Sequence, residues 1–339
     1  ARLGTSYEVP IATRNSYVSA RAEQDGLPNK PRPEDFQPIR VLGRGAYGKV
    51  LLVKEKTTNR LFAQKQLKKA TMVVQKHTYE QTKNERAILE SVRHPFIVKL
   101  YYALQDEAKL YLILEYAQGG ELFTHLIQQR LFTESVASFY IAELVLALTH
   151  LHLNVGVVYR DLKPENCLLD RHGHLVLTDF GLSKIPEDGE QCGTILGTAE
   201  YIAPEVLLGE PYDSAVDWWS LGAVTFDLLT GSPPFTGNNY SKIIEKITKS
   251  KLVLPFHLSP YAKDFVTRLL RKDPRKRLGG CMPADLDKIK KHKFFRKVDF
   301  YALEHDYRSI TPPIVPIITD PALAENFSDE FTSMPLISP

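Results

Sequence analysis

The sequence is poor in cysteine, methionine and tryptophan, with three, three and two of these residues among 339. The cysteines, Cys167, Cys192 and Cys281, are odd in number and form no CxxC pair. Neither a disulfide framework nor a cysteine-based zinc site is therefore predicted, and we expect a reducing compartment.

Neither positive nor negative charge dominates, because 43 Lys and Arg residues are nearly balanced by 40 Asp and Glu residues, for a net charge of +3. This balance excludes the broad basic surface of a general nucleic-acid binder. The first ten residues lack the apolar core of a signal peptide, and no run approaches the roughly 18 apolar residues of a membrane helix. We expect no membrane partner. The chain starts at Ala1 rather than methionine, so we also expect a piece of a longer protein.

The remaining composition, 43% hydrophobic and 24% charged, is that of a globular protein large enough for two lobes. Residues 1–35 are rich in Ser, Asn, Pro and charge, and predict an extended arm. Residues 36–117 predict three antiparallel strands, a helix over 79–92 with Glu85 on its apolar face, and two further strands.

Residues 118–295 are mainly helical in pattern and include a long amphipathic run from about Glu134 to His152. Residues 296–339 form an irregular tail that is too apolar to be simply disordered. The predicted class is α+β, with a small antiparallel-sheet lobe and a larger helical lobe.

Gly43, Gly45 and Gly48 form a GxGxxG pattern, which alone is weak evidence because dinucleotide-binding folds share it. Here the β-rich run "KVLLV" follows, so the glycines cap a hairpin instead of opening a helix, which excludes a nucleotide-binding dehydrogenase. Glycines at this turn let backbone amides approach a phosphate. A plain hairpin turn is the alternative for the motif taken alone.

Lys65 lies on an alternating strand and Glu85 on the apolar stripe of the predicted helix. Neither side chain is one that a protein buries without a partner. Pairing them would satisfy both and direct the Lys65 ammonium at phosphate oxygens, whereas two separate solvated charges are the alternative.

The stretch "YRDLKPENCLLD" crowds charges between apolar segments, and taken alone would be an ion-paired surface loop. Asp179 ends an apolar strand downstream. Asp161 can accept a proton from an attacking hydroxyl, and Lys163 can meet the transferring phosphoryl group. Asn166 and Asp179 offer oxygen ligands to Mg²⁺. Arg160 has no role in this set and is expected to bind an anion other than the transferred phosphoryl group.

These motifs resemble the protein kinase family from about Phe36 to the last residue. The glycine loop, "AQK", Glu85, "YRDLKPEN", "DFG", "APE", "DWWSLG" and "RKDPRKRLGG" occur in the family's order. Lys163 and Thr198 match its serine/threonine branch. The resemblance implies transfer of the ATP γ-phosphate to serine or threonine, with ATP and Mg²⁺ as cofactors.

The resemblance also implies two scaffold contacts and a nucleotide pocket. Arg277 pairs with Glu205, and Asp217 supports the catalytic loop. Leu114 is the gatekeeper. Six residues are expected around the adenine: Leu42, Val50, Ala63, Leu168, Glu115 and Ala117. The backbone of Glu115 and Ala117 is expected to form hydrogen bonds with the base.

"HPFIVKL", "YRD" and the tail resemble the AGC group, most closely the N-terminal kinase domain of the mitogen- and stress-activated kinases, with the ribosomal S6 kinases next. Such relatives carry a second kinase domain. The tail is expected to wrap the small lobe, with Phe327 and Phe331 packing near the nucleotide. Ser338 occupies the turn-motif phosphosite, and the hydrophobic motif that normally follows it is missing.

Substrate residues are also implied by the resemblance. Three acidic residues are expected to bind arginines or lysines upstream of the phosphoacceptor: Glu121, Glu165 and Asp227. An apolar wall beyond the phosphoacceptor is expected from three others: Ile195, Ala199 and Ile202.

Thr194 matches the activation-loop phosphosite, and an upstream activating kinase is expected. Its phosphate would be read by Arg160 and Lys184. A helix position that is often basic in relatives is Gln81, which predicts weaker coupling of this phosphate to the Glu85 helix.

The basic runs "RKDPRKR" and "KIKKHKFFRK" are predicted to be solvated helix faces rather than import or docking signals. A monomer in nucleus and cytoplasm, stress or mitogen signalling, and a histone tail or transcription factor as substrate rest on resemblance. The competing class is a scaffold with this fold but no activity. Lys65, Asp161, Asn166 and Asp179 are all present, which argues against it.

Overall fold

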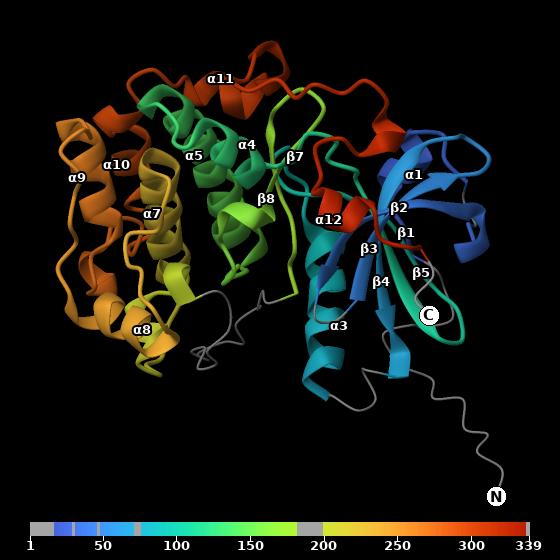
Figure 1. The fold of residues 1–339 in the computed structure, drawn as a ribbon, viewed down its shortest axis with the longest axis horizontal. Coiled ribbons are helices and arrows are strands. Elements are labelled where there is room, and N and C mark those ends of the chain that lie inside the picture. The colour runs from blue at the N-terminus through green and yellow to red at the C-terminus, as the bar shows by residue number, and fades with distance from the viewer. Residues whose placement is uncertain (1–16, 29–30, 46–47, 71–75, 182–198, 337–339) are drawn as a thin grey trace, which may run out of the picture. The chain divides into compact units, whose positions relative to one another are not determined.

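A computed structural model describes residues 17–28, 31–45, 48–70, 76–181 and 199–336 (Figure 1). Two compact units are present. Unit 1 comprises Ala1–Arg93, Val98–Gly120 and Ile317–Pro339, and unit 2 comprises His94–Ile97 and Glu121–Pro316. The arrangement confirms the α+β class, since unit 1 is built on an antiparallel sheet and unit 2 is mainly helical.

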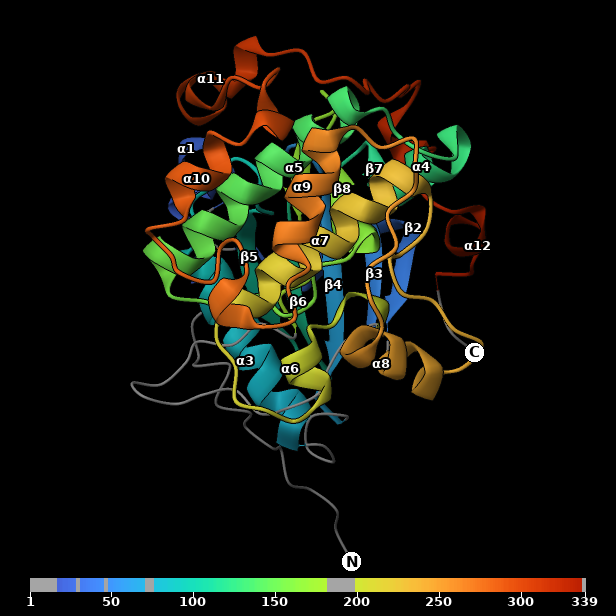
Figure 2. The ribbon, with the colours of Figure 1, turned by 90° about the vertical axis from the view of Figure 1, so that its left-hand side faces the viewer.

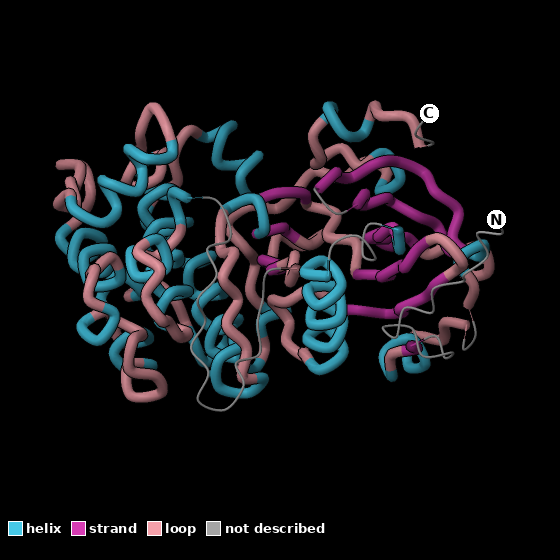
Figure 3. The backbone as a smooth tube through the Cα atoms, turned by 90° about the horizontal axis from the view of Figure 1, so that it is seen from below, coloured by secondary structure: helices cyan, strands magenta, loops and turns pink. Residues whose placement is uncertain are grey.

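The sheet of unit 1 has six strands in the order β1-β5-β6-β4-β3-β2, drawn in magenta in Figure 3. Its strands are β1 (Tyr17–Val18), β2 (Phe36–Gly45), β3 (Gly48–Glu55), β4 (Leu61–Lys68), β5 (Leu100–Gln105) and β6 (Lys109–Leu114). The pairs β2–β3 and β3–β4 are antiparallel, as the sequence predicted.

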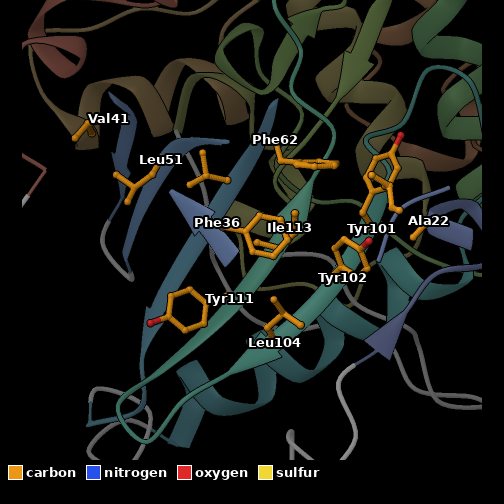
Figure 4. Close-up of a cluster of buried hydrophobic side chains, with 12 residues drawn as sticks. Ala22, Phe36, Val41, Leu51, Phe62, Tyr101, Tyr102, Leu104, Tyr111 and Ile113 are labelled. Atoms are coloured by element: carbon orange, nitrogen blue, oxygen red, sulfur yellow. The ribbon is translucent and has the colours of Figure 1, made fainter. Parts of the chain in front are cut away.

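Alternate side chains along these strands enter two different cores, because successive residues of a strand point to opposite faces. One, the Phe36 cluster, is shown in Figure 4 and consists of Ala22, Leu27, Phe36, Val41, Leu51, Val53, Phe62, Tyr101, Tyr102, Leu104, Tyr111 and Ile113. The other, the Leu42 cluster, consists of Leu42, Leu52, Tyr116 and Ala324, with Ile39, Val50, Leu61, Ala63 and Phe327 packed against it.

The prediction that residues 1–35 form an extended arm is wrong for residues 17–28. Strand β1 pairs with β5, and helix α1 (Ala20–Gln24) follows, with the Ser19 side chain accepting from the backbone N–H of Ala22. Ala22 and Leu27 are buried in the Phe36 cluster. A helix of five residues is too short to show a period, and what holds it is burial against the sheet.

Helix α3 (Lys76–Ser91) carries the predicted buried stripe. Glu85, Ile88, Leu89 and Val92 are all buried. The expected amphipathic helix in unit 1 is therefore confirmed.

Unit 2 contains most of the helices. They are α4 (Leu122–Gln129), α5 (Glu134–Thr149), α6 (Pro204–Leu207), α7 (Ala215–Thr230), α8 (Tyr240–Lys249), α9 (Pro260–Leu269), α10 (Leu286–Lys290) and α11 (Phe300–His305). Figure 1 shows α7 between α9 and α5, and Figure 2 views the same helices with α9 in front. Helix α7 contacts both. Strands β8 (Cys167–Leu169) and β9 (Leu175–Leu177) pair antiparallel, and β7 (Gly120–Glu121) lies at the boundary of the units.

Helix α5 is not amphipathic, which corrects the sequence prediction. It continues as a π-helix over His150–Val155, and eleven of its residues are buried, distributed around the helix. The 22 residues Glu134–Val155 are long and apolar enough to span a membrane, contrary to the expectation that no such run exists. Since 67% of the most apolar window is buried inside the protein, the segment has the character of a core helix.

Phe96 and Ile97, the first residues of a strand expected over 96–105 in the small lobe, belong to unit 2. The backbone N–H of Leu177 donates to the carbonyl of Phe96, and Ile97 forms a bridge with Leu177. The local apolar pattern predicted a strand but not its partner.

The tail divides between the units, with residues 296–316 in unit 2 and 317–339 in unit 1. In unit 1 it passes the edge strand β2, and its two phenylalanines reach different faces of the sheet. Phe327 packs on the Leu42 cluster, whereas Phe331, in helix α12 (Asp329–Thr332), packs on the Phe36 cluster. The expectation that Phe331 lies near the nucleotide is therefore wrong, because the chain crosses the sheet edge between the two residues.

Candidate active site

The glycine hairpin is formed as predicted, with Gly45 opposite Gly48 and Gly43 opposite Val50. A Cβ on Gly48 would lie 1.9 Å from the carbonyl oxygen of Gln66, so this glycine is required by the approach of β4. A Cβ on Gly43 would meet nothing within 4 Å. Gly43 thus leaves open space beside the backbone, as a phosphate-binding turn needs.

Lys65 and Glu85 form the predicted ion pair inside unit 1. The Lys65 Nζ donates to both carboxylate oxygens of Glu85, at 2.6 and 2.9 Å. Glu85 is buried, and helix α3 brings it to strand β4. The alternative of two separate solvated charges is excluded.

Three of the unit 1 residues expected around the adenine, Leu42, Val50 and Ala63, lie together in the Leu42 cluster. Phe327 stacks on Tyr116, with ring centroids 5.8 Å apart and an interplanar angle of 26°. The Tyr116 hydroxyl in turn donates to the carbonyl of Pro321. The tail therefore contributes an aromatic ring to the apolar wall expected to hold a nucleotide base.

Glu115 and Ala117 follow the end of β6, and Leu114, the expected gatekeeper, is buried. The Glu115 N–H donates to the carbonyl of Lys99, and the Glu115 carboxylate is held by Lys99 Nζ at 2.7 Å. The backbone carbonyl of Glu115 is therefore the group that can accept a hydrogen bond from a nucleotide base. Leu168, the remaining expected contact, lies on β8 in unit 2 and is half-buried.

In unit 2, Lys163 Nζ lies 3.0 Å from both carboxylate oxygens of Asp161. The Asn166 side-chain amide donates to the carbonyl of Asp161 at 2.8 Å and to its carboxylate at 2.9 Å. Burial raises the pKa of Asp161, while Lys163 and Asn166 oppose this shift. The structure thus has a buried carboxylate, oriented by Lys163 and Asn166, at the residue predicted to accept a proton.

Asn166 and Asp179 are suited to Mg²⁺ by their donor atoms. The amide group of Asn166 is directed at Asp161, so its Oδ1 remains as an acceptor. The backbone N–H of Thr178 donates to the carbonyl of Asn166, which ties the residue before Asp179 to Asn166. Asp179 has a φ of +61°, an uncommon backbone conformation that clusters at functional sites. No group of three or more His, Cys, Asp or Glu suited to a metal occurs among the described residues.

Arg160 is positioned by the predicted scaffold residue Asp217. The backbone N–H groups of Tyr159 and Arg160 both donate to the Asp217 carboxylate at 2.8 Å, and His152 contacts the same carboxylate at 2.7 Å. Arg160 has a φ of +68°, and its guanidinium donates to Tyr212. Fully buried Asp217 therefore fixes the turn that leads into Asp161.

Glu121, Glu165 and Asp227 come from three separate elements of unit 2, and the charge of Glu165 acts on both of the others. Burial raises the pKa of Asp227 to about 6, and the charge of Glu165 adds to this effect. Burial, and then the charge of Glu165, also raises the pKa of Glu121. Carboxylates that disfavour each other's ionised forms provide a favourable site for a cation.

Tyr201 was missed by the sequence reasoning. Its hydroxyl donates to the Asp227 carboxylate at 2.6 Å, and both residues are buried. A tyrosine within the apolar segment before "APE" was the available signal, because a buried tyrosine hydroxyl usually finds a partner.

Ala199 and Ile202 are buried, and Ala199 begins a 3-10 helix, Ala199–Tyr201. Six predicted residues lie outside the described residues, in part or whole: Gln81 (its side chain), Lys184, Thr194, Ile195, Thr198 and Ser338.

A family model described as "Protein kinase domain" matches residues 36–295. "Ribosomal protein S6 kinase beta" of Caenorhabditis elegans is 48% identical over 312 residues, covering 91% of this chain and 56% of the relative. "Serine/threonine-protein kinase YPK3" of Saccharomyces cerevisiae is 44% identical over 360 residues, covering 88% of this chain and 68% of the relative.

The chain belongs to the protein kinase family, as a serine/threonine kinase of AGC type. Members of this family use ATP and Mg²⁺. The chain spans little more than half the length of the first of the two relatives.

Proposed function

We propose that this kinase phosphorylates serine or threonine in protein segments that carry arginine or lysine upstream of the acceptor. The observation that supports the proposal is the set of three carboxylates in which the charge of Glu165 acts on both Glu121 and Asp227. A guanidinium entering this set would form charge-assisted hydrogen bonds and relieve the repulsion among the carboxylates.

In the proposed reaction, Asp161 accepts the proton of the substrate hydroxyl, and Lys163 meets the transferring phosphoryl group. Lys65, held by Glu85, binds phosphate oxygens of ATP. Asn166 and Asp179 would hold Mg²⁺, which neutralises charge on the phosphate oxygens. The protein thus supplies position and charge, which are what phosphoryl transfer requires.

Replacing the upstream arginines of a serine peptide by alanine is expected to lower kcat/KM about 10- to 100-fold. Hydrogen bonds to charged groups contribute about 1.5–3 kcal/mol, and about 1.4 kcal/mol corresponds to a factor of ten. Steady-state kinetics with the two peptides measures the effect. An unchanged kcat/KM would refute the proposed substrate class without touching the kinase assignment.

The preference is also expected to depend on pH. The pKa of Asp227 is about 6, so its carboxyl is ionised at pH 7 and gains a proton as the pH falls through 6. The KM for the arginine peptide should therefore rise between pH 7 and 5.5. In Asp227→Asn, whose amide oxygen can still accept from Tyr201, KM should be high at pH 7 and should change less over this range.

We further propose that Thr194 is the activating phosphosite and is phosphorylated by an upstream kinase. Arg160, which adjoins Asp161, would pair with the phosphate, together with Lys184. Thr194→Ala is expected to lower turnover on the order of tenfold or more after treatment with an activating kinase, measured against the parent treated in the same way. Equal turnover would contradict this role. Thr194→Ser, which keeps a hydroxyl that can be phosphorylated, is the matched control and should still be activated by the treatment.

The wider setting is likewise a proposal that rests on resemblance. We propose a monomer in nucleus and cytoplasm that acts in stress or mitogen signalling, on a histone tail or a transcription factor. Ser338 is proposed as a second phosphosite. Sedimentation of the chain tests whether it is a monomer, and fractionation of cells tests its localisation.

A further inference from the structure

The basic run Lys288–Lys297 divides into paired and unpaired charges. Four of its side chains face carboxylates: Lys288 with Asp285, Lys290 with Glu304, Lys291 with Asp287, and His292 with Asp264. Within the part of the chain that the structure describes, Lys293, Arg296 and Lys297 have no carboxylate within ion-pair distance, and all three are exposed. The run is therefore not a uniformly neutralised surface.

Two of these unpaired cations line a cavity of about 380 Å³ in unit 2. Arg296 and Lys297 share its wall with Ser135, Ser138 and buried Phe294. Its volume is within the range of about 300–1,000 Å³ that is usual for ligand sites. The cavity combines an apolar wall with hydroxyl groups and positive charge.

Glu134 also lines the cavity, but its carboxylate is already engaged. One oxygen accepts from the backbone N–H of Ser259 and the other from the Ser259 hydroxyl, both at 2.7 Å. This carboxylate caps helix α9 through two neutral donors. It keeps its negative charge on the cavity wall but forms no ion pair with Arg296 or Lys297, and the two cations outweigh it.

Tyr261 contacts Arg296, which lines the cavity, and Lys293, which is not among the lining residues. The Arg296 guanidinium carbon lies 5.1 Å from the centre of the Tyr261 ring, and Lys293 Nζ lies 5.6 Å from it. Arg296 also donates to the backbone carbonyl of Lys293. Contacts of this kind reduce the freedom that long side chains lose when they bind an anion.

We propose that this cavity binds the phosphomonoester group of a phosphorylated protein segment. A phosphomonoester carries close to two negative charges at neutral pH, so it gains more from Arg296 and Lys297 than a carboxylate does. The planar guanidinium of Arg296 matches phosphate oxygens in pairs. The reaction of a protein kinase produces phosphoserine and phosphothreonine in proteins, so such segments are present where this chain acts. The cavity residues belong to none of the sets assigned to ATP, metal or acceptor peptide.

The test is binding of a capped five-residue peptide with phosphoserine between two pairs of glycines, followed by ³¹P NMR at low ionic strength. The parent chain is expected to bind it at least tenfold more tightly than Arg296→Ala/Lys297→Ala, and not to bind the unphosphorylated peptide. Lys291→Ala removes a paired cation of the same run and should bind as the parent does. All three proteins should phosphorylate an unrelated peptide equally, which verifies folding.

Three results would overturn the proposal: no binding by the parent, equal binding by the parent and the double variant, or an equal loss in Lys291→Ala. A fourth is binding of inositol hexakisphosphate without binding of the phosphopeptide, which would identify a small-molecule anion as the ligand. Because transfer to the acceptor peptide is measured separately, these failures are distinguishable from failure of the proposed function.

Discussion

Asp161→Asn is expected to lower kcat for phosphate transfer by about 10²–10⁴-fold, the range that general acid–base catalysis contributes. Asp161 is buried, its carboxylate is oriented by Lys163 and Asn166, and burial raises its pKa. An amide at this position keeps the size of the side chain and the contact with Lys163, but it does not accept the hydroxyl proton.

The measurement is single-turnover transfer from MgATP to a serine peptide, with ATP binding followed separately. Binding should be unchanged, because Asp161 is not among the residues proposed to hold the nucleotide. Asp287→Asn makes the same chemical change at an exposed, ion-paired carboxylate and should retain full activity. Equal kcat in Asp161→Asn and the parent would remove Asp161 from the mechanism.

Arg277→Ala is expected to lower the free energy of unfolding by about 3–5 kcal/mol, the usual cost of removing one partner of a buried ion pair. The guanidinium contacts both oxygens of Glu205, at 2.6 and 2.9 Å, and donates to three backbone carbonyls. It also lies over the ring of Trp219. Truncation leaves the Glu205 carboxylate buried and without this partner.

Denaturant unfolding of the parent and variant measures this loss. Arg268→Ala is the matched control, because Arg268 pairs with Asp264 at a site where both side chains are about half exposed. It should cost about 0–1 kcal/mol. A similar, small loss in both variants would show that the Arg277 pair does not hold unit 2 together.

Strands β2 to β6 could be predicted because each is a run of six or more residues rich in apolar and β-branched side chains and bounded by turn residues. Helix α3 could be predicted because its buried stripe repeats at helical spacing. Lys65 and Glu85 could be paired in advance for a chemical reason: neither charge is stable when buried alone. In each case the signal is either a local pattern or a buried charge that needs an opposite charge beside it.

The remaining features of the fold and the site could not be predicted, because they depend on contacts between distant parts of the chain. Residues 17–28 are ordered by pairing with β5 and by burial of Ala22, which no local pattern records. Helix α5 was expected to have a polar face, but neighbouring helices cover it. Phe331 could not be assigned to a face of the sheet without knowing that the tail crosses the edge at β2. The hydrogen bond from Tyr201 to Asp227 likewise spans 26 residues.

The central claim is that this chain transfers phosphate to protein, as opposed to serving as a scaffold with a kinase fold. The most direct test is transfer of labelled phosphate from MgATP to a serine peptide with upstream arginines. Parent and Asp161→Asn are compared, each before and after treatment with an activating kinase. We predict transfer by the parent, increased by the treatment, and almost none by Asp161→Asn. Absence of transfer by the parent in both states, with MgATP binding intact, would contradict the claim and favour a scaffold.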